Sequence, residues 1–212
     1  MRQIWIPRHG PPDVLEVREA PDPRPGPGQV RIRTAAAGVN FADILARLGL
    51  YPDAPKTPCV VGYEVSGVVD AVGSGVTALE AGAQVVAGTH FGGYSDVVVV
   101  PASAAFPAPS NLPLESAAAL PVNYLTAWLM LIRLGNVRAG ELVLVHAAAG
   151  GVGLAALQLC RWRGAEVIGI ASAGKHERLR AAGVRHCIDS ATRNFDVEVR
   201  RLTEGQIGRA HV

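Results

Sequence analysis

The chain has 212 residues, of which 49% are hydrophobic and 18% are charged, and its formal net charge is +2. This composition is typical of a globular protein with one large domain or two small ones. So small a net charge argues against nucleic acid or a membrane surface as the main partner. We find no secretory apolar segment near the N-terminus and count no apolar run of the roughly 18–20 residues that a transmembrane helix needs. We therefore expect a cytoplasmic protein without a membrane span.

The metal-ligating residue types are scattered along the chain. Cys59, Cys160 and Cys187 are odd in number and lack C-x-x-C spacing, which predicts reduced thiols and neither a disulfide framework nor a structural zinc site. The six histidines also lack a paired-ligand spacing. We therefore predict no metal site.

The first hundred residues predict a strand-rich domain of the β-barrel type. Its expected strands are VRIRTAAAGV, VSGVVDAVGSGV, AQVVAGTH and YSDVVVVPA, separated by turn-forming stretches such as PDPRPGPGQ. One helix interrupts them at Asn40–Leu48, with Gly49 at its C-terminal cap,. Its spacing places four apolar side chains on one face, namely Phe41, Ile44, Leu45 and Leu48,.

From Leu114 the sequence becomes helical and apolar, and strand and helix then alternate in the α/β manner,. The predicted boundary lies near residue 120, which gives domains at 1–119 and 120–206.

A glycine-rich turn in the second domain predicts a dinucleotide site. It follows the short apolar strand Leu142–Val145, and a helix at Leu154–Trp162 and a strand at Glu166–Ile170 complete a βαβ unit,. The pattern Ala148-x-Gly150-x-x-Gly153 matches the fingerprint G-x-G-x-x-G with its first glycine replaced by alanine. Such a hexapeptide alone is weak evidence, because turns and small-residue packing often produce it. In this context, the backbone from Ala148 through Gly150, Gly151, Val152 and Gly153 is predicted to meet a pyrophosphate at the helix N-terminus.

The end of the second strand favours NADPH over NADH. NAD sites usually place Asp or Glu there for the ribose 2′-OH, whereas this chain has Ser172 and Lys175, which would meet a 2′-phosphate. Glu177 is the only acid nearby and is interpreted as a solvated helix residue. Lys175 could equally be an ordinary lysine at the start of a helix.

The last six residues, IGRAHV at 207–212, correspond to the translated start of a common short-read sequencing adapter followed by a stop codon. We expect this tail to be non-native, the alternative being a short natural tail. A doubly wound domain needs two βαβ halves, and 120–206 supplies the first. We therefore expect an incomplete Rossmann domain and an inactive, unstable or aggregation-prone fragment, because strand edges and apolar surface would stay uncovered.

Three stretches in order, GVNFADILARLGLYP, VVGYEVSGVVDAVGSGV and the glycine-rich segment, resemble the zinc-independent quinone oxidoreductase branch of the medium-chain dehydrogenase/reductase superfamily. Within it they look closest to vesicle amine transport protein 1 homologues, from about Ile4 to Gln206. The resemblance implies an α/β protein with a GroES-like catalytic domain before the Rossmann domain, and an active site in the cleft between them. It also implies NADPH as cofactor, a quinone or an activated carbon–carbon double bond as substrate, and a homodimeric full-length parent.

The resemblance also implies chemistry without zinc. Zinc enzymes of the superfamily carry Cys where this chain has Asn40 and His where it has Tyr63, beside Glu64. Both replacements remove ligands that a zinc site needs, and the four-cysteine lobe of those enzymes is absent. Hydride transfer would then depend on positioning and on polar groups that stabilise the developing oxyanion.

Further site residues follow from the same resemblance. Asn40, Asp43 and Tyr51 match cleft residues, with Asn40 orienting nicotinamide or substrate and Tyr51 donating a hydrogen bond or a proton. The structural alternatives are that Asn40 caps its helix, that Asp43 bonds backbone N–H groups, and that Tyr51 packs. Tyr124 and Thr126 match a segment beside the nicotinamide.

One position departs from the pattern of the family. Quinone reductases often carry I-N-Y or I-D-Y near the 2′-phosphate, where this chain reads Ile188-Asp189-Ser190, so phosphate affinity would depend more on Ser172 and Lys175. His146 is expected to be a packed neighbour rather than a base. The predicted function is an NADPH-dependent reductase, and the alternative is a non-enzymatic nucleotide-binding or trafficking protein.

Overall fold

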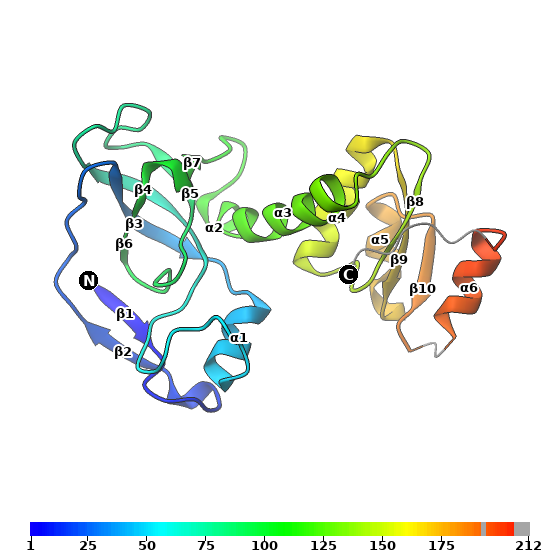
Figure 1. The fold of residues 1–212 in the computed structure, drawn as a ribbon, viewed down its shortest axis with the longest axis horizontal. Coiled ribbons are helices and arrows are strands. Elements are labelled where there is room, and N and C mark those ends of the chain that lie inside the picture. The colour runs from blue at the N-terminus through cyan, green and yellow to red at the C-terminus, as the bar shows by residue number, and fades with distance from the viewer. Residues whose placement is uncertain (192–193, 206–212) are drawn as a thin grey trace. The chain divides into compact units, whose positions relative to one another are not determined.

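The computed structural model describes residues 1–191 and 194–205 (Figure 1). The chain divides into two compact units, Met1–Val122 and Asn123 onward. The tail at 207–212, predicted above to be non-native, lies outside the described residues.

The first unit is built around a curled antiparallel sheet with the strand order β6-β3-β4-β5-β7. Its strands are β3 (Gln29–Ala37), β4 (Glu64–Val72), β5 (Gln84–Gly88), β6 (Val97–Pro101) and β7 (Ala105–Pro107). The first four confirm the strands expected from the sequence, whereas β7 was not predicted. Alternate residues of the paired strands, such as Val30 and Ile32, are fully buried, because successive side chains of a strand point to opposite faces.

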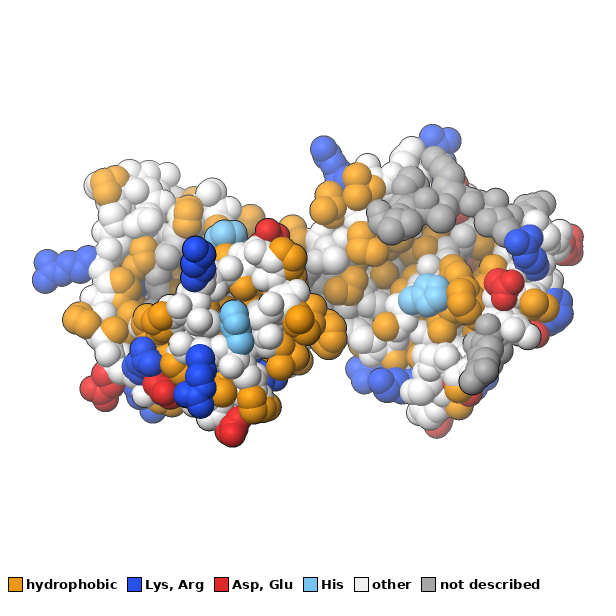
Figure 2. Space-filling model, turned by 60° about the horizontal axis from the view of Figure 1, so that its bottom comes forward, with side chains coloured by type: hydrophobic (Ala, Val, Ile, Leu, Met, Phe, Trp, Pro, Cys, Tyr) orange, Lys and Arg blue, Asp and Glu red, His pale blue; other side chains and the backbone are white. Residues whose placement is uncertain are grey.

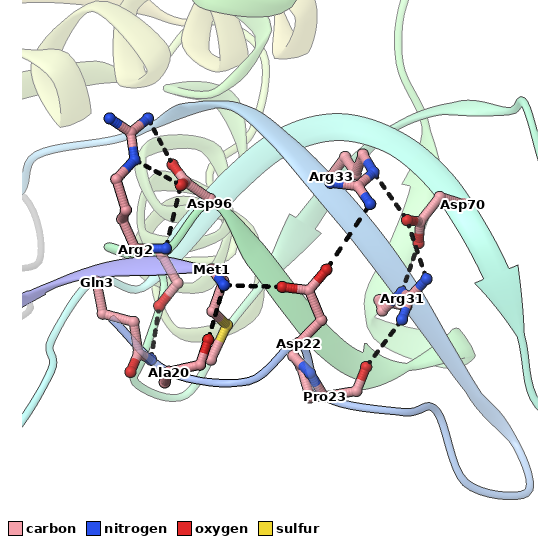
Figure 3. A network of polar contacts seen from close by, with 11 residues as sticks. Met1, Arg2, Gln3, Ala20, Asp22, Pro23, Arg31, Arg33, Asp70 and Asp96 are labelled. Atoms are coloured by element: carbon pink, nitrogen blue, oxygen red, sulfur yellow. Dashed lines mark hydrogen bonds and ion pairs between the residues drawn. The ribbon is translucent and has the colours of Figure 1, made fainter. Parts of the chain in front are cut away.

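A hairpin that the sequence did not predict precedes this sheet. It pairs β1 (Arg2–Trp5) with β2 (Glu16–Glu19), and a 3₁₀ turn at Pro12–Val14 lies between them. Figure 3 shows the polar contacts that join this N-terminal region to the sheet. Nη2 of Arg33 on β3 lies 3.7 Å from Oδ2 of Asp22, and Nε of Arg2 pairs with Oδ2 of Asp96, directly before β6, at 2.9 Å. Such pairs near the surface each contribute about 0–1 kcal/mol, so the network orients the segment more than it stabilises it.

Helix α1 (Phe41–Leu48) ends at Gly49, whose φ of 76° is left-handed and confirms the predicted cap. The predicted apolar face is mostly exposed, since Phe41 is 73% exposed and Ile44 and Leu48 are also exposed. The helix instead buries Asp43 and Ala46. The Asp43 carboxylate accepts backbone hydrogen bonds from Asn40 N and from Gly62 N, in the loop before β4.

The helical segment Leu114–Leu134 corrects the sequence-based count of apolar runs. It consists of α2 (Leu114–Ala117), α3 (Leu120–Trp128) and a π-helical turn at Leu129–Leu134. Within the described residues it is the one helix long and apolar enough to cross a membrane, and 17% of its most apolar window is buried. Isolated polar residues interrupt the run without removing its apolar character. A single such helix is weak evidence for a span, because core helices of soluble proteins have the same length and composition.

The second unit contains a parallel sheet with the order β10-β9-β8. Its elements are β8 (Leu142–Val145), α4 (Gly151–Arg163), β9 (Glu166–Ala171), α5 (His176–Ala181), β10 (His186–Asp189) and α6 (Phe195–Leu202). The predicted βαβ unit is confirmed, and β8 has the predicted bounds. Helix α4 begins at Gly151 rather than at Leu154, because the glycines form its first turn. Strand β10 was not predicted.

Gly67 on β4 packs closely against the backbone of β3, and its replacement tests the packing of the first sheet. A Cβ on Gly67 would lie 2.0 Å from the carbonyl oxygen of Arg33 on β3, so the backbone would have to move. We expect Gly67→Ala to lower the free energy of unfolding by about 2 kcal/mol or more, measured by urea denaturation. Gly88→Ala on the neighbouring β5 is the control, because its Cβ would meet no heavy atom within 4 Å in the part of the chain that the structure describes. Equal losses in both variants would contradict this account.

Candidate functional site

The turn after β8 is held tightly against helix α4. Ala147 has a φ of 49°, and Gly150 N donates to the Ala147 oxygen at 2.8 Å. Ala148 is fully buried, and its N–H donates to the Ile170 oxygen of β9 at 3.0 Å. A Cβ on Gly153 would lie 2.6 Å from the Ala147 oxygen and from the Ala148 carbonyl carbon. Only glycine therefore allows α4 to begin at this point.

The first turn of α4 presents backbone donors. Gly150 is its N-cap, in an extended conformation with φ −81° and ψ 177°. Gly151, Val152 and Gly153 follow it, and the first N–H groups of an α-helix lack intrahelical acceptors. A Cβ on Gly151 would lie 2.5 Å from Oδ1 of Asn123. This bare helix N-terminus suits an anion, because its N–H groups and the helix dipole both favour negative charge.

A cavity of about 430 Å³ lies at the carboxyl ends of the three parallel strands. It is lined by His146, Ala147, Ala149, Gly150, Ile170, Ala171, Ser172, Lys175, Ser190 and Phe195. The structure thus brings together Gly150, Ser172 and Lys175, which the sequence placed in one site. Ser190 and Phe195 were not predicted as site residues, because β10, which positions them, was not recognised. The pattern HCID before Ser190 is the signal that could have found it.

The segment after β9 presents its polar groups to solvent. Ser172 and Lys175 are exposed at the two ends of a tight turn in which Lys175 N donates to the Ser172 oxygen at 2.8 Å. His176 is directed elsewhere, since its Nε2 lies 2.9 Å from the Ala171 oxygen. Glu177 is exposed, which confirms its interpretation as a solvated side chain. His146 is also exposed, and its ring meets Phe195 edge-on at 5.1 Å.

Tyr124 and Thr126 lie on α3. The Tyr124 hydroxyl donates to Oε1 of Gln158 on α4 at 2.5 Å. Neither Tyr124 nor Thr126 is among the described residues that line the cavity after β8. Their proposed contact with a nicotinamide therefore stays a prediction.

The first unit buries two carboxylates beside α1. Glu64 is 1% exposed, and it accepts hydrogen bonds from Asn40 Nδ2 at 2.9 Å and from Val122 N at 2.8 Å. Asp43 is 4% exposed and accepts from Asn40 N at 2.8 Å and from Gly62 N at 3.1 Å. Burial raises the pKa of each carboxyl, and these hydrogen bonds oppose the rise,.

These contacts bear out the structural alternatives, and the catalytic roles of the three residues stay predictions. Asn40 is the N-cap residue of α1, as its alternative predicted, and Tyr51 packs against an apolar cluster. Asp43 bonds backbone N–H groups, which confirms its structural alternative. The side-chain amide of Asn40 is directed by Glu64, a partner that the sequence did not suggest. An ionised Glu64 only accepts hydrogen bonds, so the amide nitrogen of Asn40 is the atom that faces it. As the N-cap, Asn40 also forms a capping box with Asp43.

An aromatic group lies next to these carboxylates. The ring of Tyr51 meets that of Tyr63 edge-on at 6.3 Å, and Tyr63 lies 5.2 Å from Phe91. Tyr51 also packs against the apolar cluster that contains Ile6 and Val61. Burial raises the pKa of Tyr63 well above its ordinary value. Tyr63 was considered in the sequence only as the replacement of a zinc ligand.

The described residues contain no group of three or more His, Cys, Asp or Glu side chains that could hold a metal ion. The positions at which zinc enzymes carry Cys and His are occupied by Asn40 and Tyr63. Neither side chain supplies the thiolate or imidazole that catalytic zinc takes.

Comparison with known proteins agrees with this geometry. Residues 26–110 match the alcohol dehydrogenase GroES-like domain family. The chain is 47% identical over 190 residues to the synaptic vesicle membrane protein VAT-1 homolog of Rattus norvegicus, covering 89% of this chain and 47% of the relative. The chain thus spans about half the length of the curated relatives it matches.

Solved structures match both units. An NAD-dependent alcohol dehydrogenase is 36% identical with a TM-score of 0.89, and the match covers 97% of this chain and 68% of that one. The Escherichia coli quinone oxidoreductase complexed with NADPH is 34% identical with a TM-score of 0.89, covering 97% and 63%. A GroES-like domain followed by part of a Rossmann domain is therefore the fold. The chain belongs to the zinc-independent quinone oxidoreductase branch of the medium-chain dehydrogenase/reductase superfamily, in which VAT-1 proteins are its relatives.

Proposed function

We propose that the intact protein is an NADPH-dependent reductase that transfers hydride to a quinone or to an activated carbon–carbon double bond without zinc. The observation that carries the proposal is the cavity at the ends of β8, β9 and β10, in which Gly150, Ser172 and Lys175 meet. NADPH would supply the hydride, and the protein would supply binding, orientation and charge stabilisation.

The residues of this cavity suit a dinucleotide phosphate. The N–H groups of Gly151, Val152 and Gly153 would bind the pyrophosphate at the start of α4, since Gly150 N already donates to the Ala147 oxygen. The Lys175 ammonium and the Ser172 hydroxyl would bind the 2′-phosphate, and Ser190 adds a hydroxyl to the same cavity. Among its described lining residues there is no Asp or Glu to accept the ribose 2′-OH of NAD,. The E. coli relative is a complex with NADPH, which supports the same choice.

The first unit would act on the substrate. Asn40, oriented by Glu64 at 2.9 Å, would hold the substrate or the nicotinamide amide. Tyr51 would donate a hydrogen bond or a proton to the oxygen on which negative charge develops. Asp43 would contribute indirectly, because its bonds to Asn40 N and Gly62 N fix the loop that carries Asn40.

The direct test is NADPH oxidation by the purified intact protein with 1,4-naphthoquinone and with a simple enone. We expect turnover with at least one of these acceptors and tighter binding of NADPH than of NADH. Binding of NADPH without turnover on a broad acceptor panel would favour the non-enzymatic alternative. Absence of both binding and turnover would overturn the proposal.

The preference for NADPH should depend on one ammonium group. We expect Lys175→Ala to weaken NADPH binding about 10-fold, because it removes a charge-assisted contact to the 2′-phosphate, and to leave NADH binding nearly unchanged. Calorimetric titration with both nucleotides measures the difference. The control is Lys56→Ala, which removes the same charge from an exposed position in the first unit. Equal weakening for both nucleotides would contradict the assignment of Lys175.

The role of Asn40 predicts a change in turnover without a change in cofactor affinity. We expect Asn40→Ala to lower kcat about 10-fold or more, the range for loss of an orienting polar group, with NADPH affinity within about twofold of wild type. The control is Asn111→Ala, at an exposed turn of the same unit. An unchanged kcat in a folded Asn40→Ala protein would remove Asn40 from the mechanism.

A further inference from the structure

The hydroxyl of Tyr63 has an unusual environment. It is buried, and no hydrogen-bond partner for it exists among the described residues. Buried hydroxyl groups nearly always have a partner, because an unpaired one loses its hydrogen bonds to water and gains none in exchange. The described residues hold two further hydroxyls of this kind, those of Thr34 and Tyr94, and Tyr63 is distinguished from them by its ring contact with the candidate site residue Tyr51.

Tyr51 is the group best placed to be that partner. The two rings meet edge-on at 6.3 Å with an interplanar angle of 78°. After burial, the Tyr51 hydroxyl is the largest influence that raises the pKa of Tyr63, and Asp43 and Asp53 raise it further. Tyr63 therefore stays protonated and keeps a hydrogen to donate. Both tyrosines are partly buried, but the Tyr63 hydroxyl itself is inaccessible, so Tyr51 is the member of the pair that would meet a ligand.

We propose that Tyr63 is a positioning residue that acts through Tyr51: it donates a hydrogen bond to the phenolic oxygen of Tyr51 while Tyr51 donates to the carbonyl oxygen of the substrate. This inference rests on the proposed reductase function. It assigns a role to the position at which zinc enzymes of the superfamily carry a metal ligand.

NADPH, held by the backbone after β8 and by Lys175, would supply a hydride to the electrophilic carbon of the acceptor. An electron pair of the conjugated system would then move onto the carbonyl oxygen of the acceptor. Tyr51 stabilises that oxygen by a hydrogen bond or gives it a proton. In the second case the Tyr51 oxygen becomes negatively charged, and the hydrogen bond from Tyr63 stabilises it until water returns the proton.

The alternative is that Tyr63 only packs. Its ring lies 5.2 Å from Phe91 in a tilted arrangement, and Phe at position 63 would keep that contact. Tyr63→Phe therefore removes the hydroxyl alone. Thr34→Val is the matched control, because Oγ1 of Thr34 is another buried hydroxyl of the same unit for which the described residues supply no partner.

The first measurement does not need turnover. Labelling the tyrosine ζ carbons with ¹³C gives an NMR spectrum in which the signals of Tyr51 and Tyr63 can be assigned with Tyr→Phe variants. On titration with 1,4-naphthoquinone in the absence of cofactor, we expect the Tyr51 and Tyr63 signals to shift together with one apparent Kd. Tyr63→Phe should weaken quinone binding about 3- to 10-fold, as expected for loss of one hydrogen bond, whereas Thr34→Val should not.

The second measurement is a double-mutant cycle on the intact protein. We expect Tyr63→Phe to lower kcat about 3- to 10-fold and to have no further effect in a Tyr51→Phe background, since Tyr63 acts only through Tyr51. Thr34→Val should match wild type. Independent losses from the two tyrosine substitutions, or a Tyr63→Phe protein equal to wild type in both measurements, would overturn the inference. A wild-type protein without turnover would instead overturn the proposed function, and the NMR titration would still decide whether the two hydroxyls pair.

Discussion

The close approach of helix α4 to the turn after β8 is the constraint on which the second unit depends. A side chain at Gly153 would come within 2.6 Å of the turn's backbone, so the helix can start directly above the strand only because that position carries none. This packing turns the N-terminus of α4 toward the carboxyl edge of the sheet. The strand order β10-β9-β8 then brings the segments after all three strands to that same edge. The strand order therefore fixes the position of the site, and Ser172, Lys175 and Ser190 supply its polar side chains.

The first unit depends on a different arrangement, in which the buried carboxylates of Glu64 and Asp43 hold the side chain and the backbone of Asn40 in place. Two carboxylates are almost completely inaccessible, and burial of unpaired charge is costly. Glu64 and Asp43 are accommodated because each accepts hydrogen bonds from groups fixed by the fold. In return the amide of Asn40 has one orientation. Figure 2 shows that apolar side chains reach the surface on both units. The first unit therefore has buried carboxylates inside and apolar groups among those on its surface.

The local sequence pattern was sufficient to predict the elements in which apolar residues recur regularly or a glycine marks a turn. The four long strands of the first unit, the cap at Gly49 and the βαβ unit around Gly153 were all predicted, because each depends on residues close together in sequence. Strands β1, β2, β7 and β10 are only three or four residues long, and β1 and β2 carry charged residues, which hid them. Helical spacing placed four apolar residues on one face of α1, but it carried no signal for the burial of Asp43.

The candidate site was predictable only where a motif carried it. Gly150, Ser172 and Lys175 follow from the dinucleotide fingerprint and its distance to the next strand. The partnership of Asn40 with Glu64 spans 24 residues, and the unpaired hydroxyl of Tyr63 is a property of packing. Neither has a signature in the sequence. Ser190 and Phe195 reach the cavity through β10 and α6, and of these two residues only Ser190 had a signal in the sequence, the HCID pattern before it.

The central claim is that the backbone from Gly151 to Gly153 binds the pyrophosphate of a nicotinamide dinucleotide. The most direct measurement is an ¹⁵N-resolved NMR titration of the protein with NADPH, following the backbone amide signals. The account predicts that the amides of Gly151, Val152 and Gly153 show the largest shifts and that they saturate together with those of Ser172 and Lys175. Saturating NADPH that leaves these amide signals unmoved would contradict it.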